Sequence, residues 1–488
     1  MCENPANKAF NFRHALTKFI VVAFLSTLVL LAIWFFSKDN MMAAMAVLIL
    51  PFPLIFVYFL FSSPRFSFIT ALFANYFAIG LTRYIPAPMG LLVDAMLFVT
   101  ALSVIFSQFN TKVDWRNAGR DYTYMVIVWF VMTLFQLINP EAVSREAWFY
   151  AMRGQAFYLF LTIPLVYLVF NKPRDLQLFI NLCAWFTLLA VFKGLMQKYV
   201  MIDPWEQIWL NQPGNRSTHL LFGNLRVFSF FSDAGTYGSS MGYFGVVFAI
   251  LGIYEPAKKR KYFYFFVAIM SLYAMLISGT RSAIAVPLMG FGVYTILSKQ
   301  VKIMITMGFF VFAMFFFFKF TMIGQDNYDI RRMRSAFNSE DASLNVRKEN
   351  RKLFADYLRT RPFGGGIGSS GNWGLRFTPG TFLAETATDG WYIQIWAEHG
   401  IVGLTYYLIM IFYFFLKSCF LIFFRLKKPE NLSRAIAFTS GMAGLMVSSY
   451  SASSLGQMPN TVVVATSVAL ISLMPGWEKE QDVSDAKS

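Results

Sequence analysis

The sequence predicts an all-α, polytopic integral membrane protein with about 12–14 transmembrane helices. Its 488 residues are 57% hydrophobic and only 14% charged, with a mean hydropathy of +0.52, whereas a soluble domain carries about 25% charged residues. Apolar runs of roughly 20 residues, long enough to cross a bilayer as a helix, recur along the chain. Because only helices and closed barrels span bilayers, and these runs are long and continuous, we expect helices.

Polar segments separate about fourteen expected spans. They lie near residues 16–37, 41–63, 66–84, 88–108, 122–138, 155–170, 177–197, 236–254, 262–278, 282–298, 303–321, 401–424, 435–451 and 460–474. The chain thus divides into N-terminal transmembrane helices (1–200), a first outward loop (201–235), further transmembrane helices (236–321), a large outward loop containing helices (322–400), C-terminal transmembrane helices (401–475) and a tail (476–488). We expect the polar tail to be disordered.

Basic residues in the short loops predict the orientation of these spans. Successive spans cross the membrane in alternating directions, and every basic cluster falls on the same side. By the positive-inside rule this side is cytoplasmic. Both termini and the tail lie on the same side. The clusters are Lys8, Arg13 and Lys18; Lys112, Arg116 and Arg120; Lys172 and Arg174; Lys258, Lys259, Arg260 and Lys261; Lys299 and Lys302; and Arg425, Lys427, Lys428 and Arg434. The segments near 201–235 and 322–390 then face outward, and long loops are exempt from the rule.

Composition also limits the partners and cofactors. The net charge of +16 is accounted for largely by loop charge that sets orientation, so we expect no nucleic acid partner and assign membrane lipids as neighbours. The scattered cysteines and histidines predict neither a disulfide nor a metal site. They are Cys2, Cys183, Cys419, His14, His219 and His399.

The longest polar passage runs from Asn345 to Leu404. It begins with an expected amphipathic helix that ends before Pro362, because the residue before a proline leaves the α region. Arg347 and Arg351 are four residues apart and share a face of this helix. The apolar stripe is incomplete and comprises Val346, Leu353, Phe354, Tyr357 and Leu358. Glycines follow at 364–366 and 368, and a second helix starts at about Trp391 and continues into the membrane.

Two arginines at the expected outer surface are candidates for catalysis. Arg281, in the sequence SGTRSA, interrupts two apolar runs, and an arginine at membrane depth is a functional candidate because it is costly there. Its guanidinium could bind phosphate oxygens in pairs, or it could simply extend to the headgroups. Arg226 is similar, with Asp233 seven residues later. An ion pair or an interfacial anchor is the alternative for these two residues.

The polar passage supplies further candidates for substrate binding. Arg347 and Arg351 could contact phosphate or sugar, although charged helix faces are usually only solvated. Backbone N–H groups around Gly366 could bind an anion, or the glycines could form only a flexible turn. Tyr392 could stack on a sugar, although an interfacial aromatic belt accounts for it equally well. Glu398 lies within reach of the same helix start.

Asp389 is the candidate general base. It precedes the helix that re-enters the membrane, where a carboxylate could merely cap the helix. Sugar transfer requires a base that activates an acceptor hydroxyl, and an aspartate near the bilayer surface could supply it. We therefore place Asp389 with Arg226 and Arg281 as the catalytic candidates.

Motifs over about residues 224–404 resemble the shared domain of the O-antigen ligase and O-antigen polymerase superfamily. The matching residues are Arg226-Val227-Phe228-Ser229-Phe230-Phe231-Ser232-Asp233, Ser278-Gly279-Thr280-Arg281-Ser282-Ala283, Arg361-Pro362-Phe363-Gly364, Gly366-Ile367-Gly368, Asp389-Gly390-Trp391-Tyr392 and Glu398-His399-Gly400-Ile401-Val402-Gly403-Leu404. The order of these motifs and their membrane setting carry the resemblance.

The resemblance implies a glycosyltransferase of the bacterial inner membrane that acts at the periplasmic face without a metal, nucleotide or other cofactor. Its donor would be an undecaprenyl-pyrophosphate-linked glycan, and its acceptor either lipid A–core or a lipid-linked glycan of O-antigen or exopolysaccharide. Arg226 and Arg281 match the arginines taken to hold the pyrophosphate. Many ligases have histidine and asparagine where this chain has Asp389-Gly390, so the departure leaves ligase and polymerase both open. A glycolipid transporter or flippase, or a non-catalytic partner of polysaccharide export, is the alternative.

Overall fold

The structure is a computed structural model that describes residues 24, 26–109, 113–212, 214–221, 223–337 and 342–485. Within these residues the chain is almost wholly helical, so the predicted all-α polytopic membrane fold is confirmed. Two residues in each of the strands β1 (Leu220–Leu221) and β2 (Asn224–Leu225) pair antiparallel in a small hairpin that the sequence did not predict.

The N-terminal part of the chain contains an apolar helix at Ser26–Ser37 and eight further α-helices. These are α2 (Met41–Ile49), α3 (Pro51–Ser62), α4 (Pro64–Leu81), α5 (Leu91–Ser107), α6 (Asp121–Phe135), α7 (Arg145–Met152), α8 (Tyr158–Val169) and α9 (Pro173–Leu195). Short 3₁₀ turns lie at η1 (Trp115–Ala118) and η2 (Gln136–Ile138), and π turns at η3 (Arg153–Phe157) and η4 (Met196–Val200).

The rest of the chain alternates long helices with two groups of short ones. The first group is α10 (Pro204–Leu210) and α11 (Asn215–His219), and the long helices that follow are α12 (Ala234–Tyr254), α13 (Lys258–Ile277), α14 (Ala285–Leu297, after the 3₁₀ turn η5, Arg281–Ile284) and α15 (Val301–Phe320). The second group is α16 (Tyr328–Arg334), η6 (Ser335–Phe337), α17 (Ala342–Leu358), α18 (Gly371–Phe377) and α19 (Phe382–Glu385). The chain ends with α20 (Trp391–Phe424), α21 (Pro429–Ser448) and α22 (Asn460–Asp485).

A helix occupies each of the fourteen expected spans within the described residues. By length and composition, nine of the described helices can cross a membrane, and the helices at the other expected spans are shorter or less apolar. Burial within the bundle explains why some of these helices are less apolar. The α21 helix begins with Pro429, Glu430 and Asn431 and is buried along most of its length. A helix surrounded by other helices does not need a lipid-facing apolar surface.

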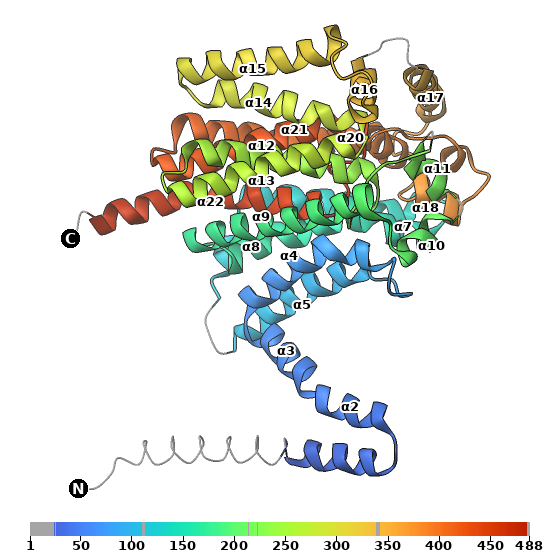
Figure 1. Cartoon of the computed structure of the whole chain (residues 1–488), viewed down its shortest axis with the longest axis vertical. Helices are drawn as coiled ribbons and strands as arrows, with labels where there is room; N and C mark the ends of the chain where they lie inside the picture. Colours follow the sequence, from blue (N-terminus) through green and yellow to red (C-terminus); the bar gives the residue numbers. More distant parts are fainter. Residues whose placement is uncertain are drawn as a thin grey trace.

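The core of the bundle contains α12, which is buried over 89% of its most apolar window and contacts α13, α14 and α21. Small residues along α12, among them Gly238, Ser239 and Gly242, let neighbouring helices approach closely. By contrast α15 is only 6% buried over its apolar window, as expected for a helix facing lipid. The α2 and α3 helices extend away from the bundle (Figure 1).

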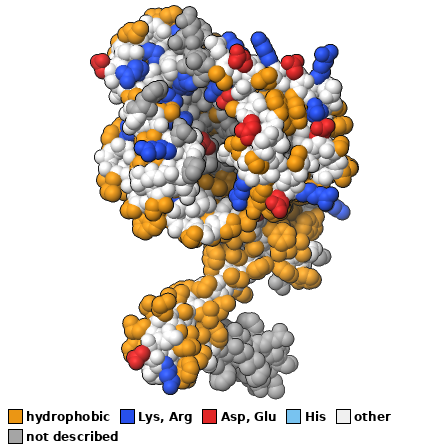
Figure 2. Space-filling model, turned by 90° about the vertical axis from the view of Figure 1, so that its right-hand side faces the viewer, with side chains coloured by type: hydrophobic (Ala, Val, Ile, Leu, Met, Phe, Trp, Pro, Cys, Tyr) orange, Lys and Arg blue, Asp and Glu red, His pale blue; other side chains and the backbone are white. Residues whose placement is uncertain are grey.

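The short helices gather at one end of the bundle. Figure 1 shows α10, α11, α16, α17 and α18 together at this end, on the right of the view. Figure 2 looks onto the same end and shows Lys and Arg side chains spread around a central hollow. Because α13 and α14 both meet η5 here, their opposite ends and the basic loops at 258–261 and 299–302 lie at the far end of the bundle.

The α20 helix bends at Gly400, which has a left-handed φ of 67°. A side chain at this position would meet the Pro362 carbonyl oxygen at 2.1 Å, so the turn after α17 packs directly on the bend. Residues 391–399 thus form a separate helical segment before the long apolar part of α20. The start predicted at about Trp391 is confirmed.

Two details differ from the sequence prediction. The tail was expected to be disordered, but α22 continues to Asp485, because Glu478 is buried and accepts hydrogen bonds from the backbone N–H groups of Lys427 and Lys428. The apolar stripe of α17 is only partly buried. Phe354 and Leu358 are buried and pack with Leu383 and Ala397, while Val346 and Leu353 are exposed.

Candidate functional site

Four arginines from three segments of the chain line one groove at the short-helix end of the bundle. The groove consists of two adjoining cavities that share Arg281, Ser282, Arg347 and Ser451. The cationic compartment, of about 180 Å³, is lined by Arg226, Gly235, Thr280, Arg281, Ser282, Arg332, Arg347, Ser451 and Ala452. The apolar compartment, of about 220 Å³, adds Ile284, Ala285, Leu288, Ser335, Ala336 and Phe337. We call the two together the basic groove.

Arg226 is held in the groove by hydrogen bonds that leave part of its guanidinium unused. Its two Nη atoms donate to the Thr218 carbonyl oxygen at 3.0 Å and to the Thr280 hydroxyl at 3.1 Å. Its Nε is buried and has no hydrogen-bond acceptor among the described residues. A buried donor without an acceptor is costly, so the site favours a ligand with acceptor oxygens.

The turn between α13 and α14 brings Arg281 and Arg332 to the same place. Gly279, with a φ of 59°, ends α13 and turns the chain into η5, where Arg281 is the first residue. Arg332, on α16, donates from its Nε to the Gly279 carbonyl oxygen at 2.6 Å. This contact fixes the second group of short helices onto the end of the bundle beside Arg226.

The walls of the basic groove bring the positive charge of four arginines together. Among the described residues that line it there is no carboxylate. Burial, together with the nearby Arg332, lowers the pKa of Arg226 to about 10. Because like charges and desolvation both disfavour the cation, an anion in the groove would relieve this cost.

Asp389 lies at the edge of the groove in a strained turn. Its Oδ1 is 3.6 Å from Nε of Arg347, and its side chain is 32% exposed. Its φ of 24° is in the left-handed region that a residue with a side chain rarely adopts. Such strain persists only where the surroundings enforce it, and it is frequent at functional sites.

The loop between α21 and α22 enforces the Asp389 turn. The backbone N–H of Trp391 donates to the Ser449 carbonyl oxygen at 2.9 Å. Gly390 has a φ of 132°, and a side chain there would meet the Tyr450 carbonyl oxygen at 2.4 Å. The same loop supplies Ser451 to the groove, so it connects the candidate base to the cations.

Three of the other predicted residues lie beside the groove without lining it. Arg351 stacks on Tyr450 at 4.1 Å from the ring centroid and donates to its hydroxyl. The Tyr392 hydroxyl donates to the Met446 carbonyl oxygen at 2.9 Å. Asp233 caps α12, accepting from the Thr236 backbone N–H at 2.9 Å. These contacts position the α21–α22 loop and the start of α12.

Gly366 and Glu398 belong to a separate buried cluster. The Glu398 carboxylate has no exposed surface and accepts from the Gly368 backbone N–H at 2.9 Å, the Ser370 hydroxyl at 2.6 Å and the Gln155 amide at 2.5 Å. The Gly366 backbone N–H donates to the Glu398 backbone carbonyl oxygen at 3.1 Å. The glycine loop is therefore packed around Glu398, and the backbone N–H groups of Gly366 and Gly368 have protein acceptors.

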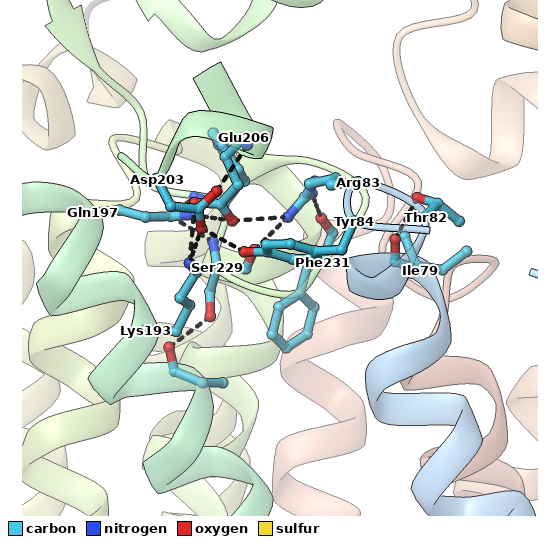
Figure 3. Close-up of polar contacts among 12 residues, drawn as sticks. Ile79, Thr82, Arg83, Tyr84, Lys193, Gln197, Asp203, Glu206, Ser229 and Phe231 are labelled. Carbon is cyan, nitrogen blue, oxygen red and sulfur yellow. Dashed lines mark hydrogen bonds and ion pairs between the residues drawn. The ribbon is translucent and has the colours of Figure 1, made fainter. Parts of the chain in front are cut away.

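A buried ion network that the sequence did not reveal holds the segment carrying Arg226 (Figure 3). Arg83, just after α4, donates to the carbonyl oxygens of Ser229, at 2.5 Å, and of Phe231. Glu206 on α10 lies 3.7 Å from Arg83 and 3.2 Å from Lys193 on α9. Because Ser229 has a left-handed φ of 49°, these bonds fix a strained loop between Arg226 and α12.

Sequence reasoning therefore found three of the four groove arginines and the neighbouring carboxylate. It did not single out Arg332, whose signal was its place in the basic run 331–334 of the outward loop. Arg83 and the loop 449–452 carried no motif. Their contribution comes from contacts with residues more than 50 positions away.

The fold and the groove define a polytopic membrane protein with a basic groove at one end of its helix bundle. Residues 265–408 match the family described as O-antigen ligase, so this part of the chain is similar to that family. The match includes Arg281, Arg332, Arg347 and Asp389, while Arg226 precedes it. No match was found among curated proteins. The family supports glycan transfer of the ligase or polymerase type and implies lipid-linked glycan substrates.

Proposed function

We propose that this protein transfers a glycan from undecaprenyl pyrophosphate to an acceptor sugar hydroxyl at the periplasmic face of the bacterial inner membrane. The observation that carries the proposal is the convergence of Arg226, Arg281, Arg332 and Arg347 in a groove with no carboxylate in its described lining. The acceptor would be the sugar of lipid A–core or of a second lipid-linked repeat unit.

The two compartments suit the two parts of such a donor. The pyrophosphate would lie in the cationic compartment, where Arg226 and its neighbours provide charge-assisted donors. The adjoining Ile284, Leu288 and Phe337 offer an apolar wall for the first isoprene units. A lipid-linked substrate needs both surfaces in contact, because its tail stays in the bilayer while its head reacts.

Asp389 would act as the general base of an inverting transfer. Its carboxylate takes the proton from the acceptor hydroxyl, and that oxygen attacks the anomeric carbon of the donor sugar. The bond from the anomeric carbon to the pyrophosphate oxygen breaks, and its electron pair leaves with the lipid pyrophosphate. The groove arginines stabilise the charge that develops on this leaving group. The partly exposed Asp389 side chain, 3.6 Å from Arg347, is within reach of such a reaction.

The membrane orientation in this proposal rests on the loop charges. The basic loops at 172–174, 258–261, 299–302 and 425–434 lie between helices at the end opposite the groove. By the positive-inside rule that end is cytoplasmic. The groove would then open on the periplasmic side, where the lipid-linked donor is presented.

The test is the surface glycan of a deletion strain complemented with wild type, Arg281→Ala or Asp389→Ala, separated on gels. Lys348→Ala is the matched control, since Lys348 is exposed on α17 and lies outside the groove lining. Core bearing at most one repeat unit would identify a polymerase. Bare core with polymer on the lipid carrier would identify a ligase. Unchanged glycan in the deletion strain would overturn the proposal.

A second assay separates transfer from transport or assembly. Purified protein in detergent, given lipid-linked glycan donor and acceptor, should form the glycan product, and Arg281→Ala should not. A transporter or a non-catalytic partner would form no product with wild type protein. Product formed equally by wild type and by both variants would show that the chemistry lies elsewhere.

A further inference from the structure

A second basic cavity lies at the end of the bundle opposite the groove. It also consists of two adjoining cavities, of about 460 and 280 Å³, which share Gln177, Arg260, Glu430 and Arg434. Arg260 is in the first turn of α13, whose other end leads to Arg281. A helix of 20 residues is about 30 Å long, which matches the thickness of a bilayer core. The two sites therefore lie at opposite membrane surfaces.

The walls of this cavity change from polar to apolar. One part is lined by Pro173, Arg174, Gln177, Arg260, Lys428, Glu430, Asn431, Arg434, Trp477 and Gln481. The other adds Ile180, Leu251, Tyr254, Glu255, Pro256, Tyr264, Pro429 and Ser433. The lining contains four basic side chains and two carboxylates. Because Lys428 also pairs at 3.3 Å with Asp482 outside the lining, the excess positive charge is that of Arg174. An apolar wall of aliphatic and aromatic side chains continues directly from the basic part.

The basic side chains of the cavity are partly oriented by neighbours. Arg260 lies 2.9 Å from Glu255, and Arg434 lies 2.6 Å from Glu430 and 2.5 Å from the Gln177 side chain. Arg174 has no hydrogen bond or ion pair with any residue that the structure describes. The cavity thus combines fixed guanidinium groups with an exposed one at its mouth.

Three long helices also begin at this cavity. They are α9, α13 and α21, and the last two start without a side-chain cap. Helix N-termini carry partial positive charge and favour anions. Their dipoles add to the positive charge of Arg174. The ligand favoured here is an anion with an apolar extension.

We propose that this second basic cavity binds an anionic glycerophospholipid of the leaflet opposite the groove. Its phosphate would lie between Arg174, Arg260 and Arg434, and an acyl chain would lie against Ile180, Leu251 and Tyr264. Basic pockets between membrane helices are suited to anionic lipid headgroups. The lipid source is favoured over a soluble anion because the charged part opens onto the apolar part at a membrane surface.

The bound lipid would stabilise the helices that build the groove. The α13 helix ends at the turn carrying Arg281, and α21 ends at the loop carrying Ser451. Both helices begin at the lipid cavity, so a lipid that joins their first turns restrains both. We expect the lipid to raise the thermal stability of the protein with little direct effect on the reacting groups.

The test measures lipid binding to the purified, delipidated full chain by native mass spectrometry and by thermal unfolding. The probes are phosphatidylglycerol, phosphatidylcholine and inorganic phosphate. Arg174→Gln/Arg260→Gln should bind phosphatidylglycerol roughly tenfold more weakly than wild type. Lys258→Gln/Lys259→Gln is the control, since it removes the same charge from the same membrane surface outside the cavity lining.

Each outcome of this test decides the proposal. Preference for phosphatidylglycerol that is lost in the cavity variant and kept in the control supports it. Equal binding of the two lipids, or equal losses in both double variants, would overturn it. Stabilisation by inorganic phosphate alone would identify a soluble anion instead. Arg174→Glu keeps the test valid if the double variant fails to fold, because Arg174 is exposed and its side chain bonds to no residue within the described ranges.

Discussion

Nε of Arg347 lies 3.6 Å from Oδ1 of Asp389. This pair joins α17, a helix of the outward segment, to the turn that begins α20. One residue of the pair lines the basic groove and the other lies at its edge. The candidate base is therefore held within reach of the cations that would bind the donor pyrophosphate, although 42 positions separate the two residues in the sequence.

Asp389→Asn should abolish glycan transfer while leaving donor binding intact. The amide keeps the size of the side chain and cannot accept the hydroxyl proton, so the rate should fall by roughly 10²–10⁴-fold. Initial rates with purified protein and donor affinity, measured separately, check this. Asp356→Asn, on the exposed side of α17, should be neutral. A near-normal rate for Asp389→Asn would place the base elsewhere.

Arg332→Ala should weaken donor binding as strongly as Arg281→Ala. Each removes one cation from a groove whose described lining has no carboxylate, and hydrogen bonds to charged groups contribute about 1.5–3 kcal/mol. We expect roughly 10–100-fold weaker binding of a lipid pyrophosphate, measured by titration. The neighbouring Arg331→Ala is the control, because Arg331 is exposed on α16. Equal effects of Arg331 and Arg332 would mean that only overall charge matters.

Gly390→Ala should reduce transfer even though the side chain added is a single methyl group. That methyl group would meet the Tyr450 carbonyl oxygen at 2.4 Å and displace the Asp389 turn. A misplacement of about 1 Å at a reacting group costs about 10²-fold in rate. Gly380→Ala is matched for its left-handed φ of 79°, with nothing within 4 Å of the added atom. If both variants lose activity equally, backbone strain rather than the contact is responsible.

Arg83→Leu should destabilise the segment 201–235 and, through it, the position of Arg226. It leaves the carbonyl oxygens of Ser229 and Phe231 without donors and removes a partner of the buried Glu206. Breaking a buried ion pair costs about 3–5 kcal/mol. Thermal unfolding and limited proteolysis of this segment check the effect.

Controls for the Arg83 prediction come from the same network and segment. Arg83→Lys should fail to restore stability, because an ammonium group cannot reach two carbonyl oxygens in the planar geometry of a guanidinium. Arg216→Ala, at an exposed position in the same segment, should unfold like wild type. Wild-type stability in Arg83→Leu would show that the network is dispensable.

Local sequence patterns predicted most of the fold. Apolar length gave the spans, and the position of Pro362 gave the end of α17, because both depend on neighbouring residues alone. The burial of α21 and the continuation of α22 to Asp485 were not predictable. They depend on which helices surround them and on Glu478 meeting the start of α21 from 47 positions away along the chain.

The site was predicted only in part, because local sequence patterns single out individual residues but not the contacts they make in the fold. Arg281 stood out because it interrupts two apolar runs, and Asp389 stood out because it precedes the helix that re-enters the membrane. Glu398 stood out equally, yet its carboxylate is buried among Gly368, Ser370 and Gln155. Whether a polar residue faces a groove or satisfies a buried loop depends on tertiary packing. That packing also selected Arg332 from the basic run 331–334 and added Arg83, which carries no motif.

The lack of carboxylates in the described lining of the basic groove has a consequence for turnover under the proposed function. When the glycan leaves, the oxygen that joined the sugar to the phosphate stays on the lipid pyrophosphate. This oxygen no longer carries a sugar and can therefore ionise. The by-product is thus more negative than the donor, and the four arginines hold it more tightly. Release of the lipid pyrophosphate, rather than bond formation, would then be the rate-limiting step. Carrier added in excess should inhibit the reaction in competition with the donor, and an enzyme that removes its phosphate should accelerate it.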